Sequence, residues 1–168
     1  AGVERHNTNI RVEECQFDGI NNDNRNAVSV IDGDDVIINA NTFVNCTRPN
    51  MPGAIDIEPD ANAFAIIKNI TITRNVFQNI GGNGGVIGVV LPLGQGILKI
   101  PAGNILIENN TIGISADNIK AVMGIFLYQM QVVNSETHSN DITISKNTIR
   151  YTYRPFRFYG VRGVIVSD

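Results

Sequence analysis

Two carboxylates two residues apart, Asp56 and Glu58, have the spacing in this sequence that best suits acid–base chemistry. They alternate with Ile55 and Ile57, so a β-strand here would turn both isoleucines to one face and both carboxylates to the other. Their Cα atoms would then lie about 6.6 Å apart. Side-chain rotation allows carboxyl separations of either about 5.5 Å or about 6.5–9.5 Å, the two distances used in glycoside hydrolysis. Repulsion between neighbouring acids raises the pKa of one of them, so the pair can supply both an acid and a base.

The same pair also fits the solvated face of an exposed strand. Like charges on one sheet face are destabilising, however, and comparable strand segments at Val28–Ile31 and Val86–Val89 carry no such pair. We therefore keep Asp56 and Glu58 as candidate catalytic residues. Asp60, which follows directly, is a candidate substrate-binding residue.

Aromatic and arginine side chains are expected beside these acids if the segments of the chain stack on one another. Tyr128 and Tyr159 would share a column with Glu58, and Arg157 would share one with Asp56. Aromatic rings cover the apolar faces of pyranoses, and arginine binds carboxylates or phosphates through paired hydrogen bonds. We predict that Tyr128, Tyr159, Arg157 and Arg154 bind substrate, although either arginine could instead pair with Asp56. An oligomer interface is the alternative, because it favours the same residue types.

A second acidic cluster, Asp32-Gly33-Asp34-Asp35, offers less chemistry. Asp35 occupies a turn position of the repeat described next, which favours a tight turn. The cluster lacks the ligand spacing of a calcium-binding loop. We predict no metal site and no cofactor. Calcium is the one ion that these acids could bind, although no motif supports it.

An internal repeat supplies the elements that would position these residues. Five segments follow the pattern [Asn/Asp]-Φ-x-Φ-x-x-Asn-x-Φ, in which Φ is Ile, Val or Phe, and a sixth begins at Gly163. Their starts are separated by 26, 34, 35, 37 and 22 residues. The segments are Asn9–Phe17, Asp35–Phe43, Asn69–Phe77, Asn104–Ile112 and Asp141–Ile149.

Each position of this pattern has a physical reason. The alternating apolar residues point into a core, and the opening Asn or Asp tolerates a left-handed turn. The seventh residue, which is Asn in four repeats and Cys15 in the first, should mark a bend at which stacked amides form a ladder. Further strands are predicted between the repeats, at Ala27–Ile31, Ala54–Glu58, Val86–Leu91, Gly124–Tyr128 and Pro155–Tyr159.

The pattern predicts an all-β fold, a single-stranded right-handed parallel β-helix (a solenoid) of about five coils. A leucine-rich repeat is the competitor, but its period is shorter, about 20–29 residues, and it is rich in leucine. We expect residues 1–168 to form one segment of a longer protein, because neither end shows a cap.

These repeats resemble those of the pectate-lyase-like superfamily, which includes polysaccharide lyases, glycoside hydrolases, epimerases and phage tailspikes. The resemblance implies the fold more firmly than the activity. The sequence lacks the Gly-His-Gly and Arg-Ile-Lys motifs of polygalacturonases. The run Tyr153–Arg157 does not match the Arg-x-Pro-x-x-Arg of pectate lyases, so no lyase base is assigned.

The composition of the chain excludes some classes of binding partner. The net charge of −3 without a visible basic face argues against nucleic acid, and no apolar run is long enough to span a membrane. Our first hypothesis is a tailspike- or appendage-like segment, extracellular or on a virion surface, that binds a surface polysaccharide or teichoic-acid-like polymer, with or without cleaving it. The alternatives are a non-enzymatic adhesin or shaft of a homotrimeric fibre, and a secreted lyase or epimerase.

Overall fold

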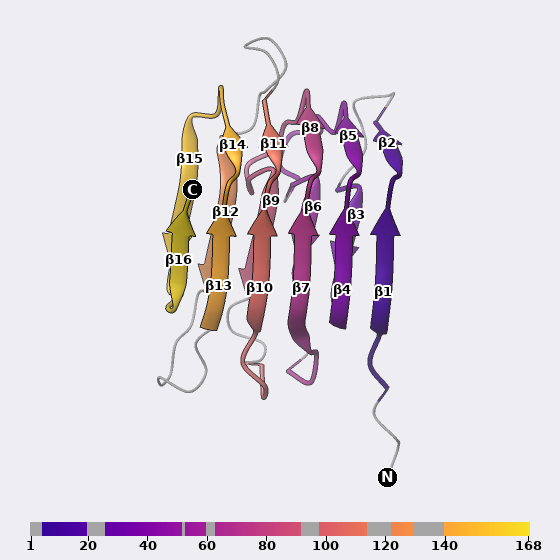
Figure 1. The fold of residues 1–168 in the computed structure, drawn as a ribbon, viewed down its shortest axis with the longest axis vertical. Helices are drawn as coiled ribbons and strands as arrows, with labels where there is room; N and C mark the ends of the chain where they lie inside the picture. Colours follow the sequence, from indigo (N-terminus) through magenta and orange to yellow (C-terminus); the bar gives the residue numbers. More distant parts are fainter. Residues whose placement is uncertain are drawn as a thin grey trace.

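The computed structural model describes residues 5–19, 26–51, 53–59, 63–91, 98–113, 122–129 and 140–168. Its strands form three parallel sheets, called A, B and C, which the chain visits in turn (Figure 1). Sheet A contains β1 (Thr8–Glu13), β4 (Gly33–Asn39), β7 (Ile67–Thr73), β10 (Gly103–Glu108), β13 (Asn140–Ser145) and β16 (Val164–Ser167). Sheet B contains β2 (Gln16–Asp18), β5 (Thr42–Val44), β8 (Val76–Gln78), β11 (Thr111–Ile112) and β14 (Thr148–Ile149). Sheet C contains β3 (Val28–Val30), β6 (Ile55–Ile57), β9 (Ile87–Leu91), β12 (Met123–Gln129) and β15 (Arg154–Tyr159).

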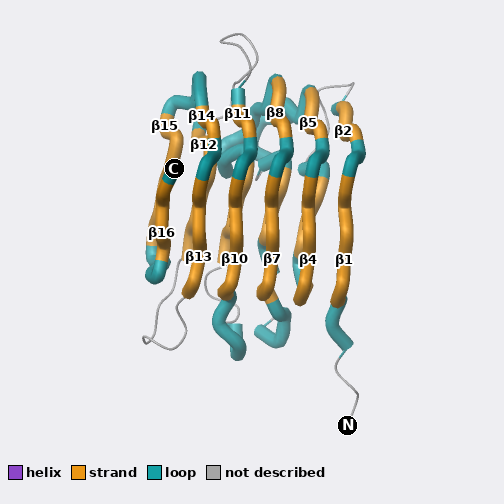
Figure 2. The backbone as a smooth tube through the Cα atoms, in the orientation of Figure 1, coloured by secondary structure: helices purple, strands orange, loops and turns teal. Residues whose placement is uncertain are grey.

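The chain therefore winds as a parallel β-helix. Each strand pairs with its equivalent in the next coil, which gives five coils of three strands and a sixth begun by β16. Figure 2 shows the sheet A strands side by side, with loops at both ends of the strands. The predicted architecture and coil number are confirmed. Each nine-residue repeat contains two strands, one in sheet A and one in sheet B, on either side of the bend predicted at its seventh position.

Left-handed residues bend the chain at fixed places in every coil. The first repeat position has a positive φ throughout, from 52° at Asn104 to 60° at Asp35. This residue is skipped in the ladder of both paired strands, since Thr8 pairs with Asp34 and Ile10 pairs with Val36, so the pairing is interrupted there without a change of register. The sixth position has φ values of 52–55°, and there the chain turns from sheet A into sheet B. The predicted left-handed geometry of the opening Asn or Asp is confirmed.

An asparagine ladder fixes this bend. The Asn75 side chain accepts hydrogen bonds from the backbone N–H and the amide of Asn41, each at 3.0 Å. Its own amide donates to Asn110 at 3.0 Å and to the carbonyl of Ile38 at 2.9 Å. Asn110 and Asn147 repeat this arrangement, and the N–H of Cys15 donates to Asn41 in the first coil. The predicted column of amides is confirmed.

Stacked apolar side chains fill the space between the sheets. The rings of Phe17, Phe43 and Phe77 lie parallel, with successive centroids 4.9 Å apart. Isoleucines from sheet A continue the core along the axis, and Ile38 and Ile72, which pair directly, are both fully buried. Because the interior is packed, chemistry belongs to the outer faces and the loops.

Candidate functional site

The outer face of sheet C carries most of the predicted site residues. Strand pairing places Asp56 of β6 between Ser29 of β3 and Gly88 of β9. The same column continues through Phe126 of β12 to Arg157 of β15. The predicted column of Asp56 and Arg157 is confirmed. The face is elongated along the solenoid axis.

The two carboxylates have different surroundings. Asp56 is only 4% exposed, although its side chain lies on the outer side of β6. The interpretation as a solvated strand face is therefore wrong for Asp56. Glu58 is half-buried, and its backbone N–H donates to the carbonyl of Val30 at 3.0 Å, which holds the end of β6 against β3. Gly88 contributes no side chain to the column between Asp56 and Phe126.

Three aromatic rings and an arginine occupy the other end of this face. The ring centroids of Phe126 and Tyr128 lie 5.2 Å apart, and those of Tyr128 and Tyr159 lie 5.1 Å apart at 38°. The guanidinium carbon of Arg157 lies 5.5 Å from the Phe126 centroid. Phe126 is buried, Tyr128 is half-buried and Tyr159 is 55% exposed. We call these four residues the aromatic–arginine face.

The structure separates some residues that the sequence grouped together. Three strand spacings, about 14 Å, lie between Asp56 and Arg157, so these two side chains are too far apart to form an ion pair. Arg154 pairs with Met123 and, by strand alternation, shares the inner side of β15 with Phe156. It lies 5.7 Å from the ring of Tyr153 and does not join the face. Asp60 lies outside the described residues.

Sequence reasoning missed a basic coil. Five of the thirteen Lys and Arg residues lie between positions 146 and 162, and no Asp or Glu occurs from 142 to 167. In the structure this stretch forms the fifth coil, and most of its side chains are exposed. The overall charge of −3 hides the cluster, whereas a charge count along the sequence in short windows would have found it.

Asp32, from the second acidic cluster, forms hydrogen bonds that connect three coils. Its carboxylate accepts hydrogen bonds from the backbone N–H of Asn7 at 2.9 Å and of Ile66 at 2.8 Å, and contacts the His6 ring at 2.9 Å. Burial raises the pKa of Asp32, but the hydrogen bonds from Ile66 and Asn7, followed by the contact with His6, more than offset it. The net pKa of Asp32 lies below its ordinary value. This carboxylate thus has a structural role, as the turn interpretation suggested.

We expect Asp32→Asn to lower the free energy of unfolding by about 1–3 kcal/mol at neutral pH, because it weakens charge-assisted hydrogen bonds. A depressed folded-state pKa stabilises the fold above the unfolded value of about 3.9, and this stabilisation is lost as the pH falls through the folded pKa. Urea unfolding from pH 7 to pH 2.5 should therefore show the variant and the wild type converging in acid. Asp35→Asn is the control, since its ion pair with Arg11 is exposed. A difference between Asp32→Asn and wild type that did not shrink in acid would contradict this account.

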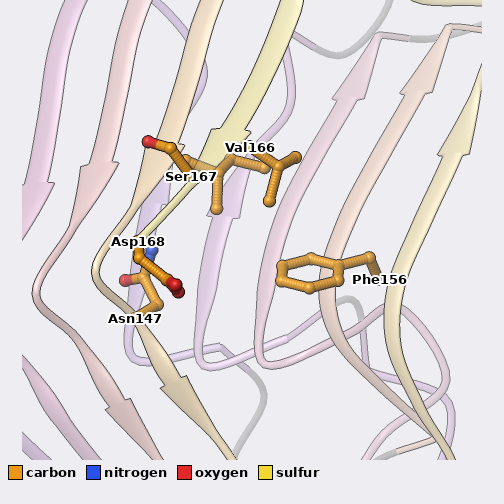
Figure 3. Close-up of a pocket in the computed structure, with 6 residues that line it drawn as sticks. Asn147, Phe156, Val166, Ser167 and Asp168 are labelled. Carbon is orange, nitrogen blue, oxygen red and sulfur yellow. The ribbon is translucent and has the colours of Figure 1, made fainter.

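A pocket of about 360 Å³ opens at the last coil, and no residue of the aromatic–arginine face lines it. Its lining residues are Ile144, Asn147, Phe156, Val166, Ser167 and Asp168. Figure 3 shows the Phe156 ring and Val166 facing this space from different strands. Both side chains belong to the inner faces of the sheets, so this pocket is the open end of the core.

The described part of the chain contains no group of three or more His, Cys, Asp or Glu side chains placed to hold a metal ion. No helix in it is long and apolar enough to pass through a membrane.

Comparison with known proteins agrees with this architecture. A family model described as "Right handed beta helix region" matches residues 1–168. No curated protein and no solved structure matches the sequence significantly.

Proposed function

Because this chain belongs to the family of right-handed β-helix regions over its whole length, we propose that it binds a polysaccharide along the outer face of sheet C and cleaves it with Asp56 and Glu58. Membership of the family supports a carbohydrate-binding or carbohydrate-degrading β-helix in general. The ligand we favour is a bacterial surface polysaccharide or a teichoic-acid-like polymer. The chain would bind it outside the cell, as part of a tailspike-like appendage.

One observation carries the proposal: Tyr128 and Tyr159 lie next to each other along the solenoid axis, with ring centroids 5.1 Å apart, on the outer face of sheet C that also carries Asp56. Exposed aromatic rings offer a flat apolar surface with a polar hydroxyl at its edge, which suits the face of a sugar ring. Glu58 lies about 10 Å from Tyr128, two strand spacings along the axis. A glycan held by the rings and running along the axis would therefore extend toward Glu58, the more accessible of the two acids.

Asp56 and Glu58 supply the chemistry in this proposal. Two carboxyl groups beside a glycosidic bond can divide the work, one protonating the leaving oxygen and the other acting as a base or nucleophile. Glu58 is the more accessible of the two, which suits it to contact the substrate first.

A second candidate is an adhesin or fibre shaft that binds without cleaving. The observation in its favour is the 4% exposure of Asp56, which leaves little of this carboxylate within reach of a ligand. Binding by the aromatic–arginine face does not require that access. Release of reducing or unsaturated ends from a bound polymer separates the two candidates.

Binding is tested by Tyr128→Ala and Tyr159→Ala on an array of bacterial surface glycans. Each is expected to weaken binding about 10- to 100-fold, because truncating an aromatic anchor removes roughly 2 kcal/mol. Tyr153→Ala is the matched control, since Tyr153 is 80% exposed and precedes β15. If Tyr153→Ala weakened binding as much as Tyr128→Ala, or neither tyrosine on the face mattered, the proposed binding face would be wrong.

A further inference from the structure

Arg157 has an arrangement suited to capturing an anion. Its guanidinium lies over the ring of Phe126, a cation–π contact that uses the flat face of the group. The N–H donors of a guanidinium point outward in its plane, so this contact leaves them available to a ligand. The ion pairs found among the described residues join His6 with Asp32, Arg11 with Asp35, and Lys146 with Glu108, and none of them involves Arg157.

Charge is distributed unevenly along the solenoid axis. Residues 1–62 contain eleven Asp and Glu against four Lys and Arg, whereas residues 63–168 contain five against nine. Arg157 lies in the basic fifth coil, and Asp56 and Glu58 lie in the acidic second coil. One face of sheet C thus runs from negative to positive over about 14 Å, three strand spacings.

We propose that the glycan bound here is sparsely acidic: a carboxylate or phosphate on a minority of its residues sits over Arg157, and an uncharged sugar lies beside Asp56 and Glu58. This inference rests on the proposed function, because it assumes that a glycan lies along sheet C. A neutral polymer would leave the donors of Arg157 without an anionic partner. A polymer charged at every residue would bring an anion against the two carboxylates, where like charges repel.

The proposal can be tested with the 168-residue chain and four polymers of graded charge. They are dextran fragments without carboxylates, gellan fragments with one on about every fourth residue, hyaluronan fragments with one on every second, and polygalacturonate with one on every residue. Calorimetry at low and physiological salt gives the affinities. Gellan fragments should bind best, about 10- to 100-fold more tightly than dextran, as expected for one charge-assisted anchor.

Arg157→Gln should lower gellan binding to the level that the same variant shows for dextran. Arg150→Gln is the matched control, because it removes the same charge from the same coil but lies in the bend before β15, away from sheet C. It should leave the preference for gellan intact. Tyrosine fluorescence gives a second reading of binding, since the chain contains no Trp and two of its four tyrosines, Tyr128 and Tyr159, lie on the proposed face.

The possible outcomes separate this inference from the proposed function. If dextran and gellan bind equally and this binding still depends on Tyr128, the proposed anionic group over Arg157 is overturned. The proposal that a glycan binds the outer face of sheet C then stands. If polygalacturonate binds most tightly, the proposal that only a minority of the sugar residues are acidic is overturned. Failure to bind any of the polymers overturns both proposals. Single-stranded poly(U) is tested beside the glycans. If it binds more tightly than every glycan and this binding depends on Arg157, the face is assigned to nucleic acid and the glycan ligand is overturned.

Discussion

Replacing Asn75 by alanine is expected to lower the free energy of unfolding by about 3–5 kcal/mol. Asn75 is fully buried, and its side chain makes four hydrogen bonds to neighbouring coils. Alanine would leave the N–H of Asn41 and the carbonyl of Ile38 buried without these partners, and each orphaned group costs about 1–3 kcal/mol. Domains are stable by only about 5–15 kcal/mol, so the loss should be visible directly in a urea unfolding curve.

Asn83→Ala provides the comparison for Asn75→Ala. Asn83 donates its amide to Asn50 at 2.7 Å in an exposed turn, so the same chemical change there should cost less than about 1 kcal/mol. Equal losses in the two variants would mean that the ladder stabilises the fold no more than a surface amide does. In that case the bend between sheets A and B would have to be held by the strands alone.

Asp56→Asn and Glu58→Gln are expected to reduce polymer cleavage about 10²- to 10⁴-fold each, the contribution of a positioned acid or base. Both substitutions keep the size of the side chain and remove its proton-transfer chemistry. Glycan binding through Tyr128 and Tyr159 should persist, because those rings lie two or more strand spacings from the acids. The measurement is the rate of release of new chain ends from the polymer at saturating substrate.

Ser29→Ala serves as the control for cleavage. Ser29 is the exposed neighbour of Asp56 on β3, so its substitution alters the same column without touching a carboxylate. Thermal unfolding of all three variants checks that the fold survives. Full activity in both Asp56→Asn and Glu58→Gln would remove these residues from the mechanism, and a wild-type chain that binds but never cleaves would favour the adhesin.

The repeat predicted most of the fold because its signals are local. Alternating Ile and Val mark the sheet A strands, and Asn at the seventh position marks the bend. The left-handed residue before that Asn escaped prediction, because Glu14, Ala40, Arg74 and Lys146 carry no common preference for positive φ. The conformation recurs in all five coils, including the first, where Cys15 stands in place of Asn, so it follows the bend between stacked strands and not the residue type, which is a tertiary effect.

The candidate site was less predictable than the fold. Strand alternation correctly put Asp56 on the outer side of β6, and counting positions correctly aligned Arg157 with Asp56. Burial of an outward side chain depends on what covers the face, which no strand pattern encodes, so the 4% exposure of Asp56 could not be foreseen.

The bend between sheets A and B also determines how the chain can change its length. Two residues separate each sheet A strand from the following sheet B strand in all five coils, whereas the other connections differ from coil to coil. An inserted residue in this bend would move one amide out of line with those above and below it. Insertions and deletions can therefore accumulate only at the other two corners of each coil, so new surface loops can arise there while the interior keeps its order.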